Sequence, residues 1–186
     1  CWVEGLLSTI YDVFLDQIVD GQIYTKGTGE RDPAREHWTR LHELNLAQNA
    51  LLVFDRGYYS KELYEDLVSD GCHVLMRLNK GNHLTRLGSD DFSWTAASTD
   101  GKPVLYRVVR VPMPEQSNEE AEYLVTNITD PSISPALLYN LYFERWNIET
   151  KYRELKEWWE LEEFTGTSCN SIEQELYINL LFSNLA

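Results

Sequence analysis

The stretch LYFERWNIETKYRELKEWW, residues 141–159, is the most informative part of this chain. Four of its residues follow the spacing Y-x2-R-x3-E-x6-K: Tyr142, Arg145, Glu149 and Lys156. At ~100° per residue on an α-helix, their side chains fall inside a sector of about 60°. An apolar stripe borders that sector and consists of Leu141, Ile148, Tyr152, Leu155 and Trp159. The pattern predicts a helix whose core-facing side is bordered by a tyrosine, two cations and a carboxylate, which is typical of an active-site wall.

This spacing resembles the YREK signature of insertion-sequence-4-type transposases, which belong to the DDE family of DNA strand-transfer enzymes. A second segment, LLVFDRGYYS at 51–60, resembles the strand around that family's second catalytic aspartate. Weaker similarity runs through STIYDVFLDQIVDGQIY, GERDPAREHW, CHVLMRLNKG and FTGTS, so the resemblance covers nearly the whole chain. It implies a ribonuclease-H-like α/β fold and an enzyme that cleaves and joins transposon DNA ends, acting as a dimer when two ends are held together.

The resemblance implies that Asp55 and Glu149 are catalytic carboxylates that bind Mg²⁺ or Mn²⁺. Such phosphodiester chemistry uses two divalent ions ~3.5–4 Å apart, and these hard cations prefer oxygen ligands. Asp55 follows the apolar run ALLVF at 50–54, which is typical of a buried strand. Ligand sites of α/β sheets lie at the carboxyl ends of such strands. The local alternatives are a turn role for Asp55 and, for Glu149, an ion pair with a cation four residues away.

Three further side chains of the signature are expected to contact DNA phosphate: Tyr142, Arg145 and Lys156. Arginine offers a bidentate fork and lysine a point charge, while the tyrosine hydroxyl would donate to a phosphate oxygen. Trp146 is expected to stack on an unpaired base. The alternative for Tyr142 and Trp146 is packing in the core. The alternative for Arg145 and Lys156 is an ordinary position on the protein surface.

One departure from the family concerns the beginning of the chain. The family's first catalytic aspartate lies in a DG-[ST]-like segment upstream of the stretch that Leu6–Ile23 resembles, whereas this sequence starts at Cys1. We therefore expect a fragment without the first strand of the fold, without one of three metal-binding carboxylates, and catalytically incomplete alone. Asp12 aligns with an ordinary position of the next strand.

Composition agrees with a globular protein, but the charge opposes DNA binding. The chain has 186 residues and a formal net charge of −14, whereas attraction to phosphate needs positive charge. Acidic residues cluster at 115–122 and 157–163. Cations are expected near the proposed site at Arg56, Arg77, Lys80, Arg145, Lys151, Arg153 and Lys156. We expect this part of the protein to bind DNA weakly and in a salt-dependent way.

The cysteines and the hydropathy of the sequence bear on the cellular compartment of the protein. Cys1, Cys72 and Cys169 form an odd set without C-x2-C spacing, which argues against zinc and fits a reducing compartment. The sequence has no apolar run of the ~18–20 residues that span a membrane. These features fit the cytoplasm, and the resemblance to insertion-sequence transposases implies a bacterial protein that acts at the nucleoid.

The remaining patterns predict the order of elements. Strands at 6–14 and 18–24 form a hairpin, a helix follows at 34–44, and strands at 50–54 and 73–78 flank a helix capped by Ser60. Short strands, HLTRL among them, then fill 79–130, and Ser134 and Pro135 begin the signature helix.

We therefore expect a ribonuclease-H-like core at 1–78, a β-rich insertion at 79–130, and the catalytic and C-terminal helices of the core at 131–186. Two other functions stay open at this point. One is a non-enzymatic transposase relic or partner-binding fragment, and the other is a ribonuclease-H-like nuclease without strand transfer.

Overall fold

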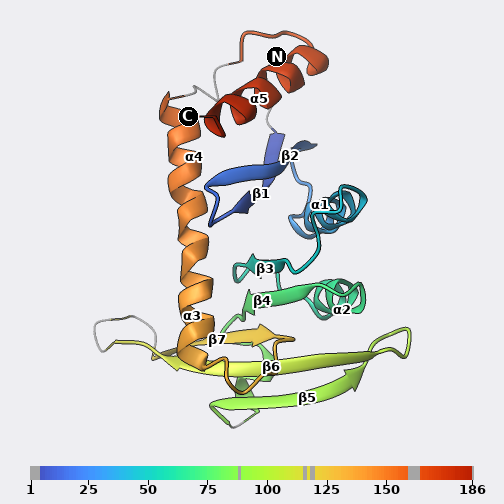
Figure 1. The fold of residues 1–186 in the computed structure, drawn as a ribbon, viewed down its shortest axis with the longest axis vertical. Helices are drawn as coiled ribbons and strands as arrows, with labels where there is room; N and C mark the ends of the chain where they lie inside the picture. The colour runs from blue at the N-terminus through green and yellow to red at the C-terminus, as the bar shows by residue number, and fades with distance from the viewer. Residues whose placement is uncertain (1–4, 88, 115–116, 118–119, 159–163, 186) are drawn as a thin grey trace. The chain divides into compact units, whose positions relative to one another are not determined.

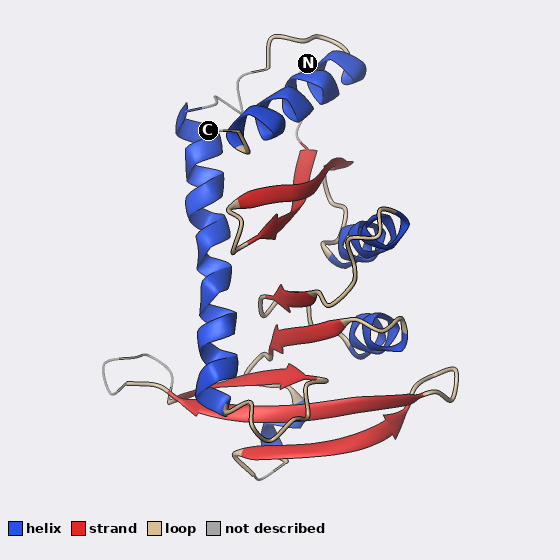
Figure 2. Cartoon of the chain, viewed as in Figure 1, coloured by secondary structure: helices blue, strands red, loops and turns tan. Residues whose placement is uncertain are grey.

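The computed structural model describes residues 5–87, 89–114, 117, 120–158 and 164–185. They form a mixed α/β chain (Figures 1 and 2), so the predicted α/β class is confirmed. The chain divides into two compact units. The first unit comprises Cys1–His37 and Glu144–Ala186, and the second unit comprises Trp38–Phe143.

The first unit begins with an antiparallel hairpin of β1 (Gly5–Asp12) and β2 (Gln17–Thr25), as predicted. Asp12 shapes its turn, because one carboxylate oxygen accepts the backbone N–H groups of Phe14 at 2.9 Å and Leu15 at 3.0 Å. Asp16 in the same turn has φ = 56°, a left-handed conformation that aspartate tolerates better than most residues. Asp12 is thus a turn residue of the hairpin.

One face of the hairpin packs on α4 (Asn147–Trp158) and α5 (Cys169–Ser183). The buried centre of this core consists of Ile18, Leu155, Leu176 and Leu180. Polar contacts fix the same face: the hydroxyl groups of Thr9 and Tyr152 lie 2.7 Å apart. The Asn184 side chain, just beyond α5, pairs with both backbone groups of Ile18 at 2.8 Å.

Helix α1 (Arg31–Glu43) begins three residues before the predicted start, with Pro33 in its first turn. Its buried His37 joins it to the hairpin. The Nδ1 atom lies 2.6 Å from Asp20 Oδ2 and the Nε2 atom 3.0 Å from Ser8 Oγ. Because successive strand residues point to opposite faces, Ser8 contacts α1 while Thr9 contacts α4.

The second unit contains a five-stranded mixed sheet of order β3-β4-β7-β6-β5. Strands β3 (Leu51–Phe54) and β4 (His73–Arg77) are parallel and joined by α2 (Lys61–Ser69). Ser60 caps α2 as predicted, since its Oγ accepts the Leu63 N–H at 3.1 Å. The parallel pair with its connecting helix is a βαβ unit.

The other three strands form the predicted β-meander. They are β5 (Asp91–Ala97), β6 (Pro103–Pro112) and β7 (Ala121–Thr126), and β7 pairs antiparallel with β4. The sheet therefore continues through the expected 78/79 division, while the three-part domain division itself stays a prediction. The expected strand at HLTRL is wrong: His83–Arg86 is the 3₁₀ helix η1, whose first turn is held by the Asn82 side chain on Leu84 N–H.

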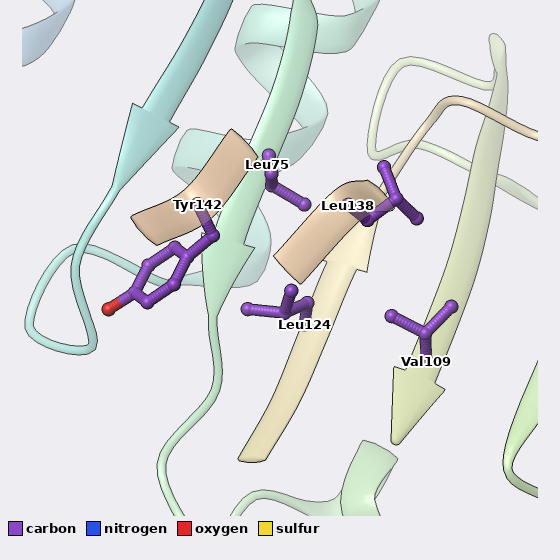
Figure 3. Close-up of a cluster of buried hydrophobic side chains, with 5 residues drawn as sticks. All are labelled: Leu75, Val109, Leu124, Leu138 and Tyr142. Carbon is purple, nitrogen blue, oxygen red and sulfur yellow. The ribbon is translucent and has the colours of Figure 1, made fainter. Parts of the chain in front are cut away.

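Helices cover both faces of this sheet. Val74 and Met76 alternate with Leu75 along β4, and all three are buried. Leu75 belongs to a cluster with Val109, Leu124, Leu138 and Tyr142, drawn in Figure 3. The last two come from α3 (Pro135–Phe143), which begins at the predicted Ser134 cap. Tyr64 of α2 stacks on Tyr106 of β6, with ring centroids 4.6 Å apart.

The prediction of one continuous helix over the signature is wrong. Helix α3 ends at Phe143, a 3₁₀ turn η2 (Glu144–Trp146) follows, and α4 begins at Asn147. Asn147 donates from its side chain to Glu144 at 2.9 Å, and asparagine favours such local bonds over a helix interior. The boundary between the two units falls at the same place, between Phe143 and Glu144. Trp159 of the predicted stripe lies outside the described residues.

Candidate active site

Asp55 lies directly after β3, at the carboxyl end of that strand. Its Oδ1 atom accepts the backbone N–H of Arg56 at 2.7 Å, and its carbonyl accepts the N–H of Tyr58 at 3.1 Å. The carboxylate is half-buried. Asp55 is thus a turn residue, as the local alternative stated, and it also occupies the strand end where α/β sheets place ligand sites.

Tyr142 contacts the Asp55 side chain. Its hydroxyl donates a hydrogen bond of 2.8 Å to Asp55 Oδ1, although the residues are 87 positions apart. The tyrosine is 2% exposed and packs in the cluster of Figure 3, where its hydroxyl points away from the four aliphatic side chains. Tyr142 therefore both packs in the core and contacts Asp55. Its contact with DNA phosphate stays a prediction.

The other members of the signature belong to the first unit. Arg145 Nη1 lies 3.5 Å from Glu149 Oε1, one helical turn away. The Arg145 guanidinium also lies over the Trp146 ring, 5.1 Å from its centroid. Glu149 is 48% exposed in its side chain, and Trp146 is 46% exposed. Lys156 is exposed on the same helix.

The ion pair expected as the alternative for Glu149 is thus present. The pair is partly shielded from solvent, because the Arg145 side chain is only 14% exposed while that of Glu149 is half-exposed. The ion pair with Glu149 is compatible with a phosphate contact by Arg145, because the same positive charge attracts both groups. Contact between Glu149 and Asp55, which belong to different units, stays a prediction.

Two of the cations expected near the site, Arg77 and Lys151, form contacts inside the protein. Arg77 forms an ion pair of 2.6 Å with Glu122, and both side chains are largely buried. Lys151 is buried on α4 and donates to the Ser183 carbonyl of α5 at 3.1 Å. These residues therefore hold elements together, and the positive charge available to a nucleic acid is smaller than the sequence suggests.

Tyr58 and Tyr59 follow Asp55 in the turn after β3. Burial, with the nearby carboxylates Glu65 and Glu62, raises the pKa of Tyr59 to about 12. Tyr59 therefore stays protonated near neutral pH and is no proton acceptor there. Tyr58 packs its ring against Phe54 at 5.2 Å between centroids.

The donor set can be tested against a divalent cation. Asp55 and Glu149 offer carboxylate oxygens, the ligand type that Mg²⁺ and Mn²⁺ prefer. Within the ranges described, no group of three or more His, Cys, Asp or Glu side chains is arranged to hold a metal. Asp55 and Glu149 therefore suit the ion by the chemistry of their oxygen atoms, and they supply two carboxylates.

Sequence patterns gave no sign of the contact between Tyr142 and Asp55, because it joins segments 87 positions apart. The buried Asp20–His37–Ser8 chain was missed for the same reason. No helix among the described residues has the length and hydropathy needed to cross a membrane.

The family described as "Transposase DDE domain" matches residues 3–185. The chain is also 29% identical over 154 residues to "Transposase InsG for insertion sequence element IS4" of Escherichia coli (strain K12). That match covers 74% of this chain and 34% of the relative, so the chain spans about a third of the relative's length.

Proposed function

Because this chain belongs to the transposase DDE domain family, we propose that it forms the catalytic core of a DNA transposase that cleaves and joins transposon ends. The observation that carries the proposal is Asp55, set at the end of β3 and bonded by the first residue of the YREK signature. The contact joins the signature to the strand-end carboxylate, although the two residues lie 87 positions apart.

The fold we propose is ribonuclease-H-like. An antiparallel hairpin, followed by a helix and a parallel β3–α2–β4 unit, supports this topology. The three meander strands and the helices that follow agree with an insertion before the catalytic helix.

Asp55 and Glu149 are the proposed ligands of Mg²⁺ or Mn²⁺. When bound, such ions activate an attacking oxygen and stabilise the departing oxygen of a phosphodiester. The role of the two residues is to present hard oxygen donors of negative charge, Asp55 from a bonded position and Glu149 from an exposed helix surface.

Arg145, Trp146 and Lys156 are the proposed DNA contacts. The exposed Trp146 ring already lies under the Arg145 guanidinium, an arrangement that supports stacking on a base beside a phosphate contact. Lys156 adds a point charge further along α4. The DNA ends themselves are the proposed partner.

A non-enzymatic role remains the second candidate, because the net charge of −14 disfavours DNA binding by these residues. The intact signature favours the enzyme.

The test is nicking of a duplex that carries the DNA flanking the gene, by the product of the complete reading frame, with and without Mg²⁺. Asp55→Asn and Glu149→Gln are each expected to reduce cleavage by at least ~10²-fold. Glu157→Gln, an exposed carboxylate on the same helix, is the matched control and should cleave normally. Cleavage that survives Glu149→Gln, or none by the unaltered protein, would contradict the proposal.

A further inference from the structure

An ion pair of the second unit lies at the same end of the sheet as Asp55. Arg77 is the last residue of β4, and its Nη2 atom lies 2.6 Å from Glu122 Oε1 of β7. Resting on the function proposed above, we propose that Glu122 is a positioning residue that keeps the Arg77 cation from competing with a divalent ion for Asp55.

The register of the sheet makes Arg77 a neighbour of Asp55. The last residue pair of the parallel strands β3 and β4 is Phe54 with Met76. Asp55 and Arg77 are the next residues on the two segments. Because neighbouring strands lie ~4.7–4.9 Å apart, the carboxylate and the guanidinium begin from adjacent backbone positions.

Both side chains belong to the face of the sheet that α3 covers. Leu75 packs in the cluster of Figure 3 with Tyr142 of α3. Arg77 follows Leu75 by two positions on β4 and therefore points to the same face. Asp55 is on that face too, because it accepts the hydroxyl of Tyr142.

The ion pair is shielded from solvent on this face. The Arg77 side chain is 15% exposed and that of Glu122 is 13% exposed. Both charges act on Tyr139 of α3: burial raises the pKa of this tyrosine, the charge of Glu122 raises it further, and the charge of Arg77 opposes the rise. Charges in such a setting interact more strongly than charges in water.

A guanidinium next to a metal-binding carboxylate opposes metal binding, because it repels the cation and attracts the same oxygen atoms. Glu122 counters both effects. Its carboxylate balances the charge of Arg77. Since β4 lies between β3 and β7, the bond to Glu122 also draws the guanidinium toward β7, away from the strand that leads into Asp55.

The experiment measures Mn²⁺ affinity by calorimetric titration for this chain, Glu122→Gln, Arg77→Met and their combination. Glutamine keeps the size of Glu122 and removes its charge. Glu120→Gln is the matched control, because it removes the same charge from an exposed position just before β7. Urea unfolding without metal and affinity for a fluorescent DNA duplex are measured on the same variants.

We expect Glu122→Gln to weaken Mn²⁺ binding by ~10-fold or more, the usual loss when a supporting partner of a metal site is removed. The double variant should return to within about twofold of the unaltered chain, because the competing cation is gone as well. Arg77→Met alone should bind Mn²⁺ at least as tightly as the unaltered chain. Glu120→Gln should change Mn²⁺ affinity by less than about twofold.

The DNA measurement separates a metal role from a phosphate role. Glu122→Gln and Glu120→Gln each remove one negative charge, so they should change DNA affinity alike. A larger gain in DNA affinity for Glu122→Gln, with unchanged Mn²⁺ affinity, would overturn the positioning role and show that Glu122 covers Arg77 against phosphate.

Other outcomes separate this inference from the proposed function. Mn²⁺ binding that ignores Glu122→Gln, or a loss that persists in the double variant, would overturn the positioning role alone. If urea unfolding shows that Glu122→Gln does not fold, weaker Mn²⁺ binding by Arg77→Met or by the double variant would overturn it. An unaltered chain that binds no Mn²⁺ would overturn the metal site of the proposed function and this inference with it.

Discussion

Arg107 is a buried side chain with several hydrogen bonds in the second unit. It is buried in β6, forms two hydrogen bonds with Asp91 at 2.9 and 2.7 Å, and donates to the carbonyls of Ile128 and Asp130. These bonds tie the edge strand β5 and the 128–130 segment to the centre of the sheet. Arg110, on the same strand, has only a 3.6 Å contact with the exposed Asp90.

Replacement of Arg107 by alanine should therefore destabilise the protein far more than the same change at Arg110. We expect Arg107→Ala to lower the free energy of unfolding by about 1.5–3 kcal/mol, since it removes a buried guanidinium and its hydrogen bonds to the Asp91 carboxylate. Arg110→Ala should cost about 0–1 kcal/mol, as is usual for a surface pair. Urea denaturation of both variants checks this, and equal losses would show that the buried network contributes nothing special.

The cysteines should differ sharply in reactivity. Cys72 is buried, and burial raises the pKa of its thiol to about 12, whereas Cys169 is exposed at the start of α5. Only the thiolate is nucleophilic, so iodoacetamide at mildly alkaline pH should label Cys169 quickly and Cys72 only after unfolding. Peptide mass spectrometry resolves the two sites. Rapid labelling of Cys72 in the folded protein would mean that this part of the core opens readily.

At the level of elements, the segment before α5 is bonded to the helix by a carboxylate. Glu175 accepts both the hydroxyl and the backbone N–H of Thr165 at 2.8 Å. The bond from the Thr165 hydroxyl, followed by that from its N–H, lowers the pKa of Glu175 below the ordinary value of 4.5. The folded protein therefore binds this proton less readily than the unfolded chain.

The stability from this contact should be present above the ordinary glutamate pKa and disappear as the pH falls through the lowered folded value. Glu175→Gln should consequently flatten the acid side of the curve of unfolding free energy against pH. Glu173→Gln, exposed on the same helix, should leave the curve unchanged. A wild-type curve that matches Glu175→Gln between about pH 3 and 5 would refute the contact's role.

The elements show why some sequence patterns were sufficient and others were not. Ser60, Ser134 and the apolar runs act within a few residues, so the starts of α2 and α3 and the strands β3 and β4 followed from sequence alone. The 3₁₀ turn at Glu144–Trp146 did not, because helical periodicity carries no sign of the Asn147–Glu144 bond that breaks the register. HLTRL failed similarly, since Asn82 outweighs a weak strand propensity.

At the level of the whole molecule, the sequence identified the residues of the candidate site but not the contacts between them. The signature and the strand-end aspartate were recognised from sequence, but the bond between Tyr142 and Asp55 depends on how α3 packs on the sheet. The contacts of Lys151 with Ser183 and of Arg77 with Glu122 could not be predicted either, because these partners lie far apart in the sequence.

The charge of the whole chain predicts weak, salt-dependent DNA binding. A net charge of −14 repels the backbone, while exposed cations such as Lys156 attract it locally. Fluorescence anisotropy with a labelled duplex should show affinity falling as salt rises from about 50 to 200 mM. Lys156→Gln should reduce both the affinity and the salt slope. Tight binding that persists in high salt would require a binding surface of another kind.

The proposed function requires that Asp55 and Glu149 bind the same divalent ion. The most direct measurement is the Mn²⁺ affinity of the unaltered chain, Asp55→Asn, Glu149→Gln and the double variant. Each single change should weaken Mn²⁺ binding by ~10-fold or more, and the double change should add little, because both residues bind the same ion. Normal Mn²⁺ affinity in either single variant, with Glu157→Gln behaving identically, would contradict it.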